Sequence, residues 1–162
     1  MHLLADSKLV DRVFSEETTA EAVRGECGED WRAEWMGEWC RGARAVYVPH
    51  VLDCEGEQFS PVGLYFADVC GSRLAVGHQF MLEGYRKGFC AVFAARACID
   101  AFFEDYPAVD RVMGVIDAKN RAAIAVARWV GFVEKGLVGA SDGRSEYLLV
   151  LDRVIWEGRN HG

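Results

Sequence analysis

A short basic loop ahead of a long apolar helix has the composition of an anion-binding site. The loop runs Glu83-Gly84-Tyr85-Arg86-Lys87-Gly88-Phe89-Cys90-Ala91, and the helix is expected from about Gly88 to Asp105. A glycine-bearing loop that enters a helix exposes backbone N–H groups at the positive end of the helix dipole. Arg86 and Lys87 add positive charge at the same point. We therefore predict a phosphate-binding loop, with an ordinary surface turn as the alternative.

Two titratable side chains next to this loop could accept a proton. His78 is the only titratable residue in the expected strand Leu74–Leu82, and its unperturbed pKa suits base chemistry near neutral pH. Glu83 is the nearest carboxylate. A single histidine on a strand is more often structural, and that interpretation stays open. The candidate bases are His78 and Glu83.

The elements that must position these groups are clearest over residues 112–138. The apolar run that contains Val112 and Ile116 has the length of a buried strand. An alanine-rich segment after Asn120 has high helix propensity, and Gly131 suits the end of that helix. A second strand begins with Phe132. The alternative is a β-α-β packing unit without any chemical role.

The remaining segments complete the element order β-α-α-β-β-β-α-β-α-β-β, which predicts an α/β (α+β) fold. An opening strand is expected over Leu3–Val13, followed by a helix that starts at the capping box Thr18-x-x-Glu21 and ends near Gly25, and by a second helix from Asp30. Strands are expected at Ala45–Val48 and Leu64–Val69, with a turn at Gly56 and Ser60-Pro61 between them. The final strand is expected at Glu146–Val154. No repeat or linker divides the chain, so we expect a single domain over residues 1–162.

Three tryptophans in the expected second helix share one helical face. Trp31, Trp35 and Trp39 are spaced i, i+4, i+8, with largely polar residues between them. Docking of this face on the sheet is the favoured interpretation. An aromatic wall for a substrate, or a surface for a partner, is the alternative.

Composition restricts the class of protein. The chain is 51% hydrophobic and 27% charged, and it has neither an apolar run long enough for a membrane span nor a recognisable signal peptide. We therefore expect a cytoplasmic protein with no membrane partner. A net charge of −7 argues against a nucleic-acid partner and is compatible with steering of a cationic amine.

The cysteines and histidines predict neither disulfides nor a metal site. The six cysteines are Cys27, Cys40, Cys54, Cys70, Cys90 and Cys98, and none forms a C-x-x-C pair. This pattern is typical of free thiols in a reducing compartment. His50 and Cys54 could share a face, but their neighbourhood offers too few further ligands for a metal ion.

The spacing of Asn120, Ala123, Gly131 and Phe132 between two expected strands resembles the C-terminal motif block of the GNAT superfamily of N-acetyltransferases. The continuation Glu134-Lys135-Gly136 is also typical of that block. The element order extends the resemblance over nearly the whole chain. It implies a GNAT-like mixed, mostly antiparallel central sheet flanked by helices.

The resemblance implies that the basic loop holds the pyrophosphate of acetyl-CoA, the co-substrate of the family. Aligned on Gly88, the family motif Gln/Arg-x-x-Gly-x-Gly/Ala reads Tyr85-Arg86-Lys87-Gly88-Phe89-Cys90, so its first and last positions depart. A shift of one residue lets Arg86 replace the missing cation. The implied cofactor-binding residues are Phe80, Met81, Leu82, Arg86, Lys87, Gly88, Phe89, Cys90, Ala91, Asn120 and Ala123.

The implied reaction is direct transfer of an acetyl group from the CoA thioester to an amine, without a covalent enzyme intermediate. A backbone N–H from residues 80–82 would polarise the thioester carbonyl, with His78 or Glu83 as the base. The tyrosine that usually serves the family as the acid is replaced by Ala127. Tyr85, Tyr147 or a water molecule are open alternatives for this role.

Two functions remain open at this point. The first is an N-acetyltransferase that acts on an amine-bearing small molecule or protein. The alternative is a non-catalytic GNAT fold that binds acyl-CoA or serves as an assembly or interaction factor, for example a phage protein. Departures at Tyr85, Cys90 and Ala127 favour the alternative, whereas the retained Gly88 and Asn120 favour the enzyme. Exposed tryptophans would suggest a partner surface, and a homodimer is one form it could take.

Overall fold

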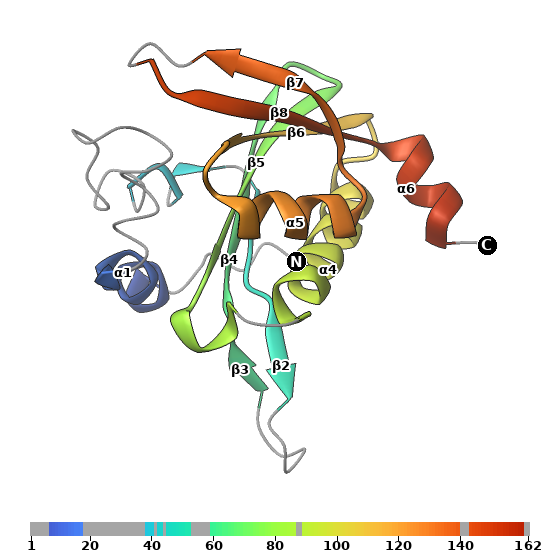
Figure 1. The fold of residues 1–162 in the computed structure, drawn as a ribbon. Coiled ribbons are helices and arrows are strands. Elements are labelled where there is room, and N and C mark those ends of the chain that lie inside the picture. Colours follow the sequence, from blue (N-terminus) through green and yellow to red (C-terminus); the bar gives the residue numbers. More distant parts are fainter. Residues whose placement is uncertain are drawn as a thin grey trace.

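The computed structural model describes residues 7–17, 38–40, 42–43, 45–52, 59–86, 89–139 and 143–160 of the chain. Within these ranges the protein forms a six-stranded sheet with the order β1-β4-β5-β6-β8-β7 and a separate β2–β3 hairpin (Figure 1). The strands are β1 (Ala45–Tyr47), β2 (His50–Leu52), β3 (Phe59–Pro61), β4 (Gly63–Cys70), β5 (Leu74–Met81), β6 (Arg111–Asp117), β7 (Val133–Gly139) and β8 (Ser145–Asp152). The helices are α1 (Ser7–Ser15), the 3-10 turn η1 (Glu83–Tyr85), α4 (Cys90–Asp105), α5 (Arg121–Val130) and α6 (Arg153–Asn160).

The central sheet separates between β5 and β6. These two strands are parallel and pair only where Leu74–Val76 meets Arg111–Met113, whereas the other neighbouring strands of the sheet pair antiparallel. Beyond Val76 the strands diverge, and Figure 1 shows the half with β4 and β5 running at a steep angle to the half with β6, β8 and β7. The predicted mixed, mostly antiparallel sheet flanked by helices is confirmed.

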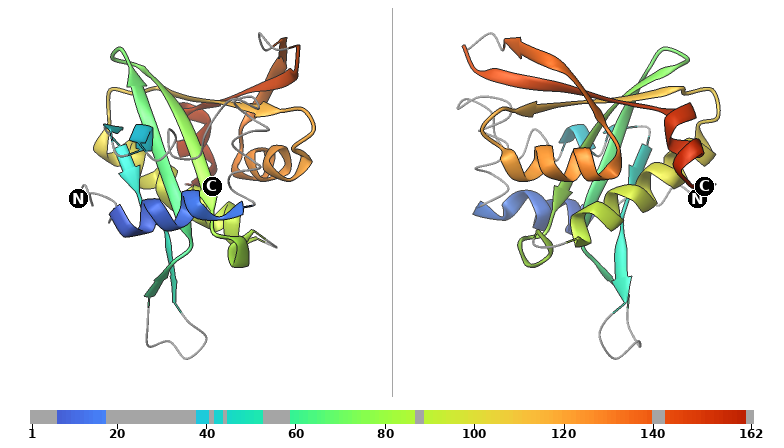
Figure 2. Two further views of the ribbon diagram at one scale, coloured as in Figure 1. Left: turned by 90° about the vertical axis from the view of Figure 1, so that its left-hand side faces the viewer. Right: turned by 45° about the vertical axis from the view of Figure 1, so that its right-hand side comes forward.

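Helices cover both faces of the β4–β5 half. Side chains alternate between the faces of a strand, so that Tyr65 and Ala67 pack with α4 in one core cluster while Leu64 and Phe66 pack with α1 in another. The left view of Figure 2 shows α1 in front of these strands and α4 behind them. Helix α5 lies beside α4 and packs Val126 against the α4 side of the sheet. We call these two sides the α4 face and the α1 face.

The predicted opening strand over Leu3–Val13 is wrong, because residues 7–15 form α1. Its buried side chains are Val10, Val13 and Phe14, a spacing of three and four that places them on one side of a helix. The loose alternation of the segment misled the prediction. The helical period was also present, and it is the one that buries these side chains against β4 and β5.

Other boundaries differ from expectation at the ends of elements. Ser60 and Pro61, predicted as a turn, lie in β3 of the hairpin. The final strand ends at Asp152 rather than Val154, because α6 begins at Arg153. The central helix begins at Cys90 rather than Gly88.

Several predictions fall partly outside the described residues. The capping box at Thr18 and Glu21 lies outside, as do Trp31 and Trp35 of the tryptophan face. Cys27 and Cys54 also lie outside, whereas the four cysteines within the described ranges, Cys40, Cys70, Cys90 and Cys98, are free thiols.

Among the described residues, no helix is long and apolar enough to cross a membrane, and no group of three or more His, Cys, Asp or Glu side chains is arranged to hold a metal ion.

Candidate active site

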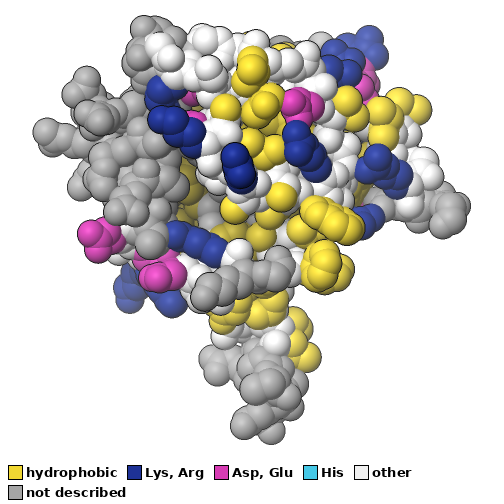
Figure 3. Space-filling model, viewed as in Figure 1, with side chains coloured by type: hydrophobic (Ala, Val, Ile, Leu, Met, Phe, Trp, Pro, Cys, Tyr) yellow, Lys and Arg dark blue, Asp and Glu magenta, His cyan; other side chains and the backbone are white. Residues whose placement is uncertain are grey.

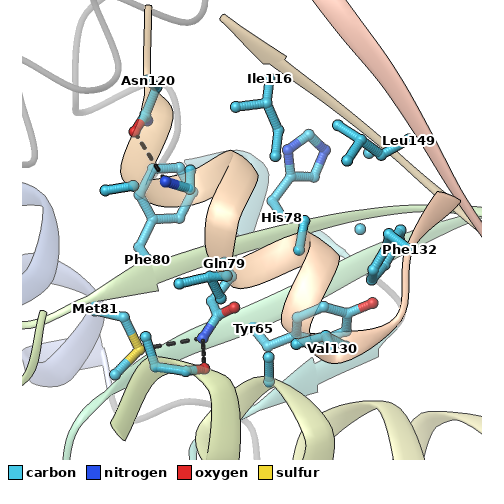
Figure 4. Close-up of a pocket in the computed structure, with 18 of the residues that line it drawn as sticks. Tyr65, His78, Gln79, Phe80, Met81, Ile116, Asn120, Val130, Phe132 and Leu149 are labelled. Atoms are coloured by element: carbon cyan, nitrogen blue, oxygen red, sulfur yellow. Dashed lines mark hydrogen bonds between the residues drawn. The ribbon is translucent and has the colours of Figure 1, made fainter. Parts of the chain in front are cut away.

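A cavity of about 320 Å³ lies where β5 and β6 separate. Its walls come from Gly77–Met81 of β5, Gly114–Ile116 of β6, the first turns of α4 and one side of α5. Figure 4 shows the side chains that surround it. Small residues leave the space open, since a Cβ atom added at Gly114 would have Gly77 O as its nearest neighbour, at 4.0 Å. The cavity is therefore bounded by the edges of β5 and β6 that no longer pair with each other.

The backbone of β5 offers hydrogen-bonding groups to this space. Leu82 donates its N–H to the Val62 carbonyl at 2.9 Å and so points toward β4. Because backbone groups point alternately to the two sides of a strand, those of Gly77, Gln79 and Met81 face the gap. The Met81 carbonyl accepts a hydrogen bond from Arg86 Nε at 2.9 Å. The Leu82 amide, predicted to contact the thioester, is already used within the sheet.

The helix ends around the cavity are fixed by side-chain hydrogen bonds. Asn120 Oδ1 accepts from the Ala123 N–H at 3.1 Å and caps α5 (Figure 4). Gln79 Nε2 donates to the Ala91 carbonyl at 3.1 Å in the first turn of α4. The predicted end of α5 is confirmed, because Gly131 has φ +121° there. The Gln79 contact ties the first turn of α4 to β5, whereas the Asn120 contact caps the start of α5.

His78 lines the cavity from the α1 face and is buried among aromatic rings. Its ring centroid lies 4.4 Å from that of Trp39 and 4.9 Å from that of Phe66. Burial lowers the pKa of His78 to about 4, although nearby Asp68 acts in the opposite direction. Among the described residues, nothing hydrogen-bonds to its buried Nε2 atom. The imidazole is therefore neutral near pH 7 and is only a weak base.

Tyr65 lines the same cavity from the α4 face. Its side chain is 4% exposed, and its hydroxyl has no hydrogen-bond partner within the described residues. Burial raises the pKa of this hydroxyl well above its ordinary value, so it remains protonated. The cavity thus contains two buried polar atoms without partners, one on each side of β5.

The turn after β5 is tied to the end of α1. Glu16 Oε2 accepts a hydrogen bond from the Glu83 N–H at 3.1 Å and lies 3.3 Å from Arg86 Nη2. Arg86 lines the cavity, whereas Glu83 is exposed and stands outside it. Lys87 and Gly88, the centre of the predicted phosphate loop, lie outside the described residues.

Aromatic side chains gather at the start of α4. Phe89 is exposed, and its ring packs against exposed Trp129 of α5 at 5.7 Å between centroids. Figure 3 shows hydrophobic side chains together with Lys and Arg side chains on the face that carries α5. Cys90 is only half-buried, and burial raises the pKa of its thiol, so it is not an activated nucleophile.

The structure brings together many but not all of the predicted site residues. Those that line the cavity are His78, Phe80, Met81, Arg86, Ala91, Asn120 and Ala123, and those in the described chain that do not are Leu82, Glu83, Phe89 and Cys90. Sequence reasoning missed Tyr65, Gln79 and Gly114. Strand alternation could have identified Gln79 and Tyr65, since both fall on the α4 face. Nothing in the sequence indicated that Gly114 would border an open gap.

Solved structures resemble this fold over most of its length. The aminoglycoside acetyltransferase AAC(6')-Ib in complex with coenzyme A matches with a TM-score of 0.70 and 17% identity, over 98% of this chain and 95% of that chain. A GNAT-family acetyltransferase from Bacillus anthracis matches with a TM-score of 0.67 and 17% identity, over 93% and 91%. A variant of the spermidine N-acetyltransferase SpeG from Vibrio cholerae matches with a TM-score of 0.61 and 16% identity, over 79% of each chain.

No protein-family model and no curated protein matches the sequence. The structural matches nevertheless define the class of architecture: the chain has the GNAT fold. The resemblance drawn from Asn120, Ala123, Gly131 and Phe132 is thereby confirmed at the level of the fold.

Proposed function

We propose that the protein is an N-acetyltransferase that transfers an acetyl group from acetyl-CoA to an amine by direct attack. The observation that carries this proposal is the separation of β5 from β6, with a cavity of about 320 Å³ in the gap. The amides of Gln79 and Met81 face this space, and a backbone donor aimed at a carbonyl oxygen stabilises the negative charge of acyl transfer. A gap between strands also suits an extended, narrow ligand.

The residues around the cavity fit acetyl-CoA. Ala91, Ala123 and Gly114 present little or no side chain, so an extended pantetheine chain could pass between β5 and α5. The guanidinium of Arg86 belongs to a side chain that lines the cavity, and it would stabilise a phosphate group there. When bound, acetyl-CoA supplies the activated acyl group, and the chain supplies its orientation and shields it from water.

His78 has a narrower role in this proposal than that of a strong base. Its Nε2 atom has no partner within the described residues and can accept a hydrogen bond from the N–H of a neutral amine. A pKa of about 4 makes it too weak to remove a proton from an ammonium ion. We therefore assign His78 to orienting an amine that arrives deprotonated. Glu83 is exposed outside the cavity and has no part in the proposed step.

The test first measures binding of acetyl-CoA and then measures acetyl transfer to an amine. Acetyl-CoA should raise the melting temperature of the protein through linkage, and thiol release should follow when spermidine, kanamycin or a simple alkylamine is added. Gly114→Leu should remove the thermal shift by filling the cavity. Gly139→Leu is the matched control, because Gly139 lies outside the cavity with nothing within 4 Å of an added Cβ. No shift at millimolar acetyl-CoA in the native protein would refute the proposal.

A non-catalytic acyl-CoA-binding protein is the second candidate. It is favoured by Ala127, which provides no acid from α5, and by the low basicity of His78. For this candidate, acetyl-CoA shifts the melting temperature but no amine in the panel releases the thiol.

A further inference from the structure

Tyr65 places a polar hydroxyl in the core of the protein beside the cavity. A buried hydroxyl without a hydrogen bond destabilises the folded protein, because the hydroxyl has given up its hydrogen bonds to water. Tyr65 carries this cost, because its hydroxyl is buried and has no partner within the described residues. An orphan polar group of this kind needs an explanation, and its position at the wall of the cavity points to a bound group (Figure 4).

Gly77 makes room for the Tyr65 hydroxyl beside β5, because glycine has no side chain to fill this position. A Cβ atom at position 77 would lie 2.5 Å from the hydroxyl oxygen and 3.1 Å from Cζ. Gly77 is also the first residue of β5 beyond Val76, where pairing with β6 ends. The hydroxyl therefore stands at the point where the strands part, the closed end of the gap.

The other polar groups around the cavity do not duplicate this hydroxyl. Among the described residues that line the cavity, Tyr65 alone carries a hydroxyl group. The Gln79 amide nitrogen contacts Ala91 O and Met81 Sδ, and Ala127 on α5 has no polar atom in its side chain. His78 reaches the cavity from the opposite face of the sheet. A group with developing negative charge on the α4 side would find its O–H donor in Tyr65.

We infer that the Tyr65 hydroxyl donates a hydrogen bond to the departing sulfur of coenzyme A, an inference that rests on the proposed acetyl transfer. As the amine nitrogen bonds to the acetyl carbon, the C–S bond breaks and its electron pair passes to sulfur. The proton lost by the amine goes to water. Tyr65 keeps its own proton and stabilises the thiolate through the hydrogen bond. Tyr65 and His78 thus act on the leaving and attacking groups from opposite faces of β5.

The experiment compares Tyr65→Phe with Tyr47→Phe. The Tyr47 hydroxyl donates to Asp105 at 2.9 Å and does not line the cavity, although its ring is a neighbour of Tyr65. Coenzyme A and desulfo-coenzyme A are the probes, and the ultraviolet absorbance of the thiolate gives the pKa of the bound thiol. We expect Tyr65→Phe to weaken binding of the coenzyme A thiolate about tenfold while leaving the affinity for desulfo-coenzyme A unchanged. The pKa of the bound thiol should rise by about one unit.

Tyr65→Phe should lower turnover without lowering stability. The kcat for acetyl transfer should fall at least about tenfold, while the melting temperature of the ligand-free protein stays the same or rises, because an unpaired hydroxyl has been removed. Tyr47→Phe should leave the thiol pKa and kcat unchanged. Gly77→Ala gives an independent check, because its Cβ displaces the hydroxyl and should reproduce the loss of kcat.

The outcomes separate this inference from the proposed function. If the native protein binds neither coenzyme A nor acetyl-CoA, the proposed function fails and the inference fails with it. If Tyr65→Phe binds coenzyme A with an unchanged thiol pKa and unchanged kcat, the inference is overturned while the proposed function stands.

Discussion

His78 shows how burial changes the chemistry that a residue type suggests. A histidine in water titrates where a general base is useful, which is why the sequence made His78 a candidate. In the fold its ring contacts the rings of Trp39 and Phe66, and its pKa is lowered to about 4 by burial. The residue type was informative about location, because His78 does line the cavity. Its basicity depends on neighbours that are distant in sequence.

The lowered pKa of His78 predicts a specific loss of stability in acid. The unfolded chain binds a proton at His78 near pH 6.5, whereas the folded chain binds it only near pH 4. Unfolding therefore becomes more favourable as the pH falls from 6.5 to 4, by up to about 3 kcal/mol, and the effect is constant below pH 4. In His78→Gln the free energy of unfolding, measured in urea, should fall less steeply across this window.

Exposed His50 provides the control for that titration. It lies on β2, and its Nδ1 atom is 2.9 Å from the Val48 carbonyl. His50→Gln should keep the full acid slope of the native protein. Equal slopes in all three proteins would show that His78 titrates alike in the folded and unfolded chains.

At the level of elements, the strand–helix–strand unit around α5 was the part most fully predicted from sequence. Asn120 and Gly131 are local signals, because a side-chain cap and a positive φ are set by the few residues around them. The cavity was less accessible to prediction. Strand alternation places Tyr65 on the α4 face, but Gly114 borders the cavity only because two strands diverge, and divergence is a property of tertiary packing.

Gly131 should be the least replaceable residue of this unit. It has φ +121°, and an added Cβ would clash with Arg159 Nη1. We expect Gly131→Ala to destabilise the protein by about 1–3 kcal/mol, because alanine is strained at this φ. Gly139→Ala is the control in the following strand, since it has no positive φ and nothing within 4 Å of the new Cβ. Thermal unfolding measures both, and equal melting temperatures would contradict the assignment.

The contact between α1 and the turn after β5 should oppose phosphate binding. Glu16 lies 3.3 Å from Arg86 Nη2, so a carboxylate and an incoming phosphate compete for one guanidinium. Glu16→Gln should tighten acetyl-CoA binding by up to about fivefold, the range of a partly exposed ion pair. Glu157→Gln makes the same charge change beside Arg153 on α6 and should leave the affinity unchanged. Weaker binding of acetyl-CoA by Glu16→Gln would indicate that Glu16 instead holds Arg86 in place for the ligand.

At the level of the whole molecule, the two faces of the β4–β5 half of the sheet contribute different groups to one cavity. The α4 face supplies helix ends and the Tyr65 hydroxyl, while the α1 face supplies His78 within an aromatic cluster. An acyl donor on the α4 side and an amine on the α1 side would meet at the gap between β5 and β6. The sequence predicted the order of most elements, but the opposition of these faces followed only from the three-dimensional packing.

The net charge of −7 predicts that the affinity for the proposed amine acceptor depends on salt concentration. An acidic protein attracts polycationic amines at low ionic strength, and added salt screens this attraction over about 10 Å at 0.1 M. We expect the KM for a polyamine acceptor to rise several-fold between roughly 0.01 and 0.3 M salt, with a much smaller rise for a monoamine, because the attraction scales with the charge of the acceptor. Steady-state kinetics at fixed, saturating acetyl-CoA measure how the KM of each amine changes with salt concentration. An identical dependence of the KM on salt for both amines would mean that the acceptor is recognised by local contacts alone, and a falling KM would contradict an acceptor whose non-reacting amino groups are positively charged.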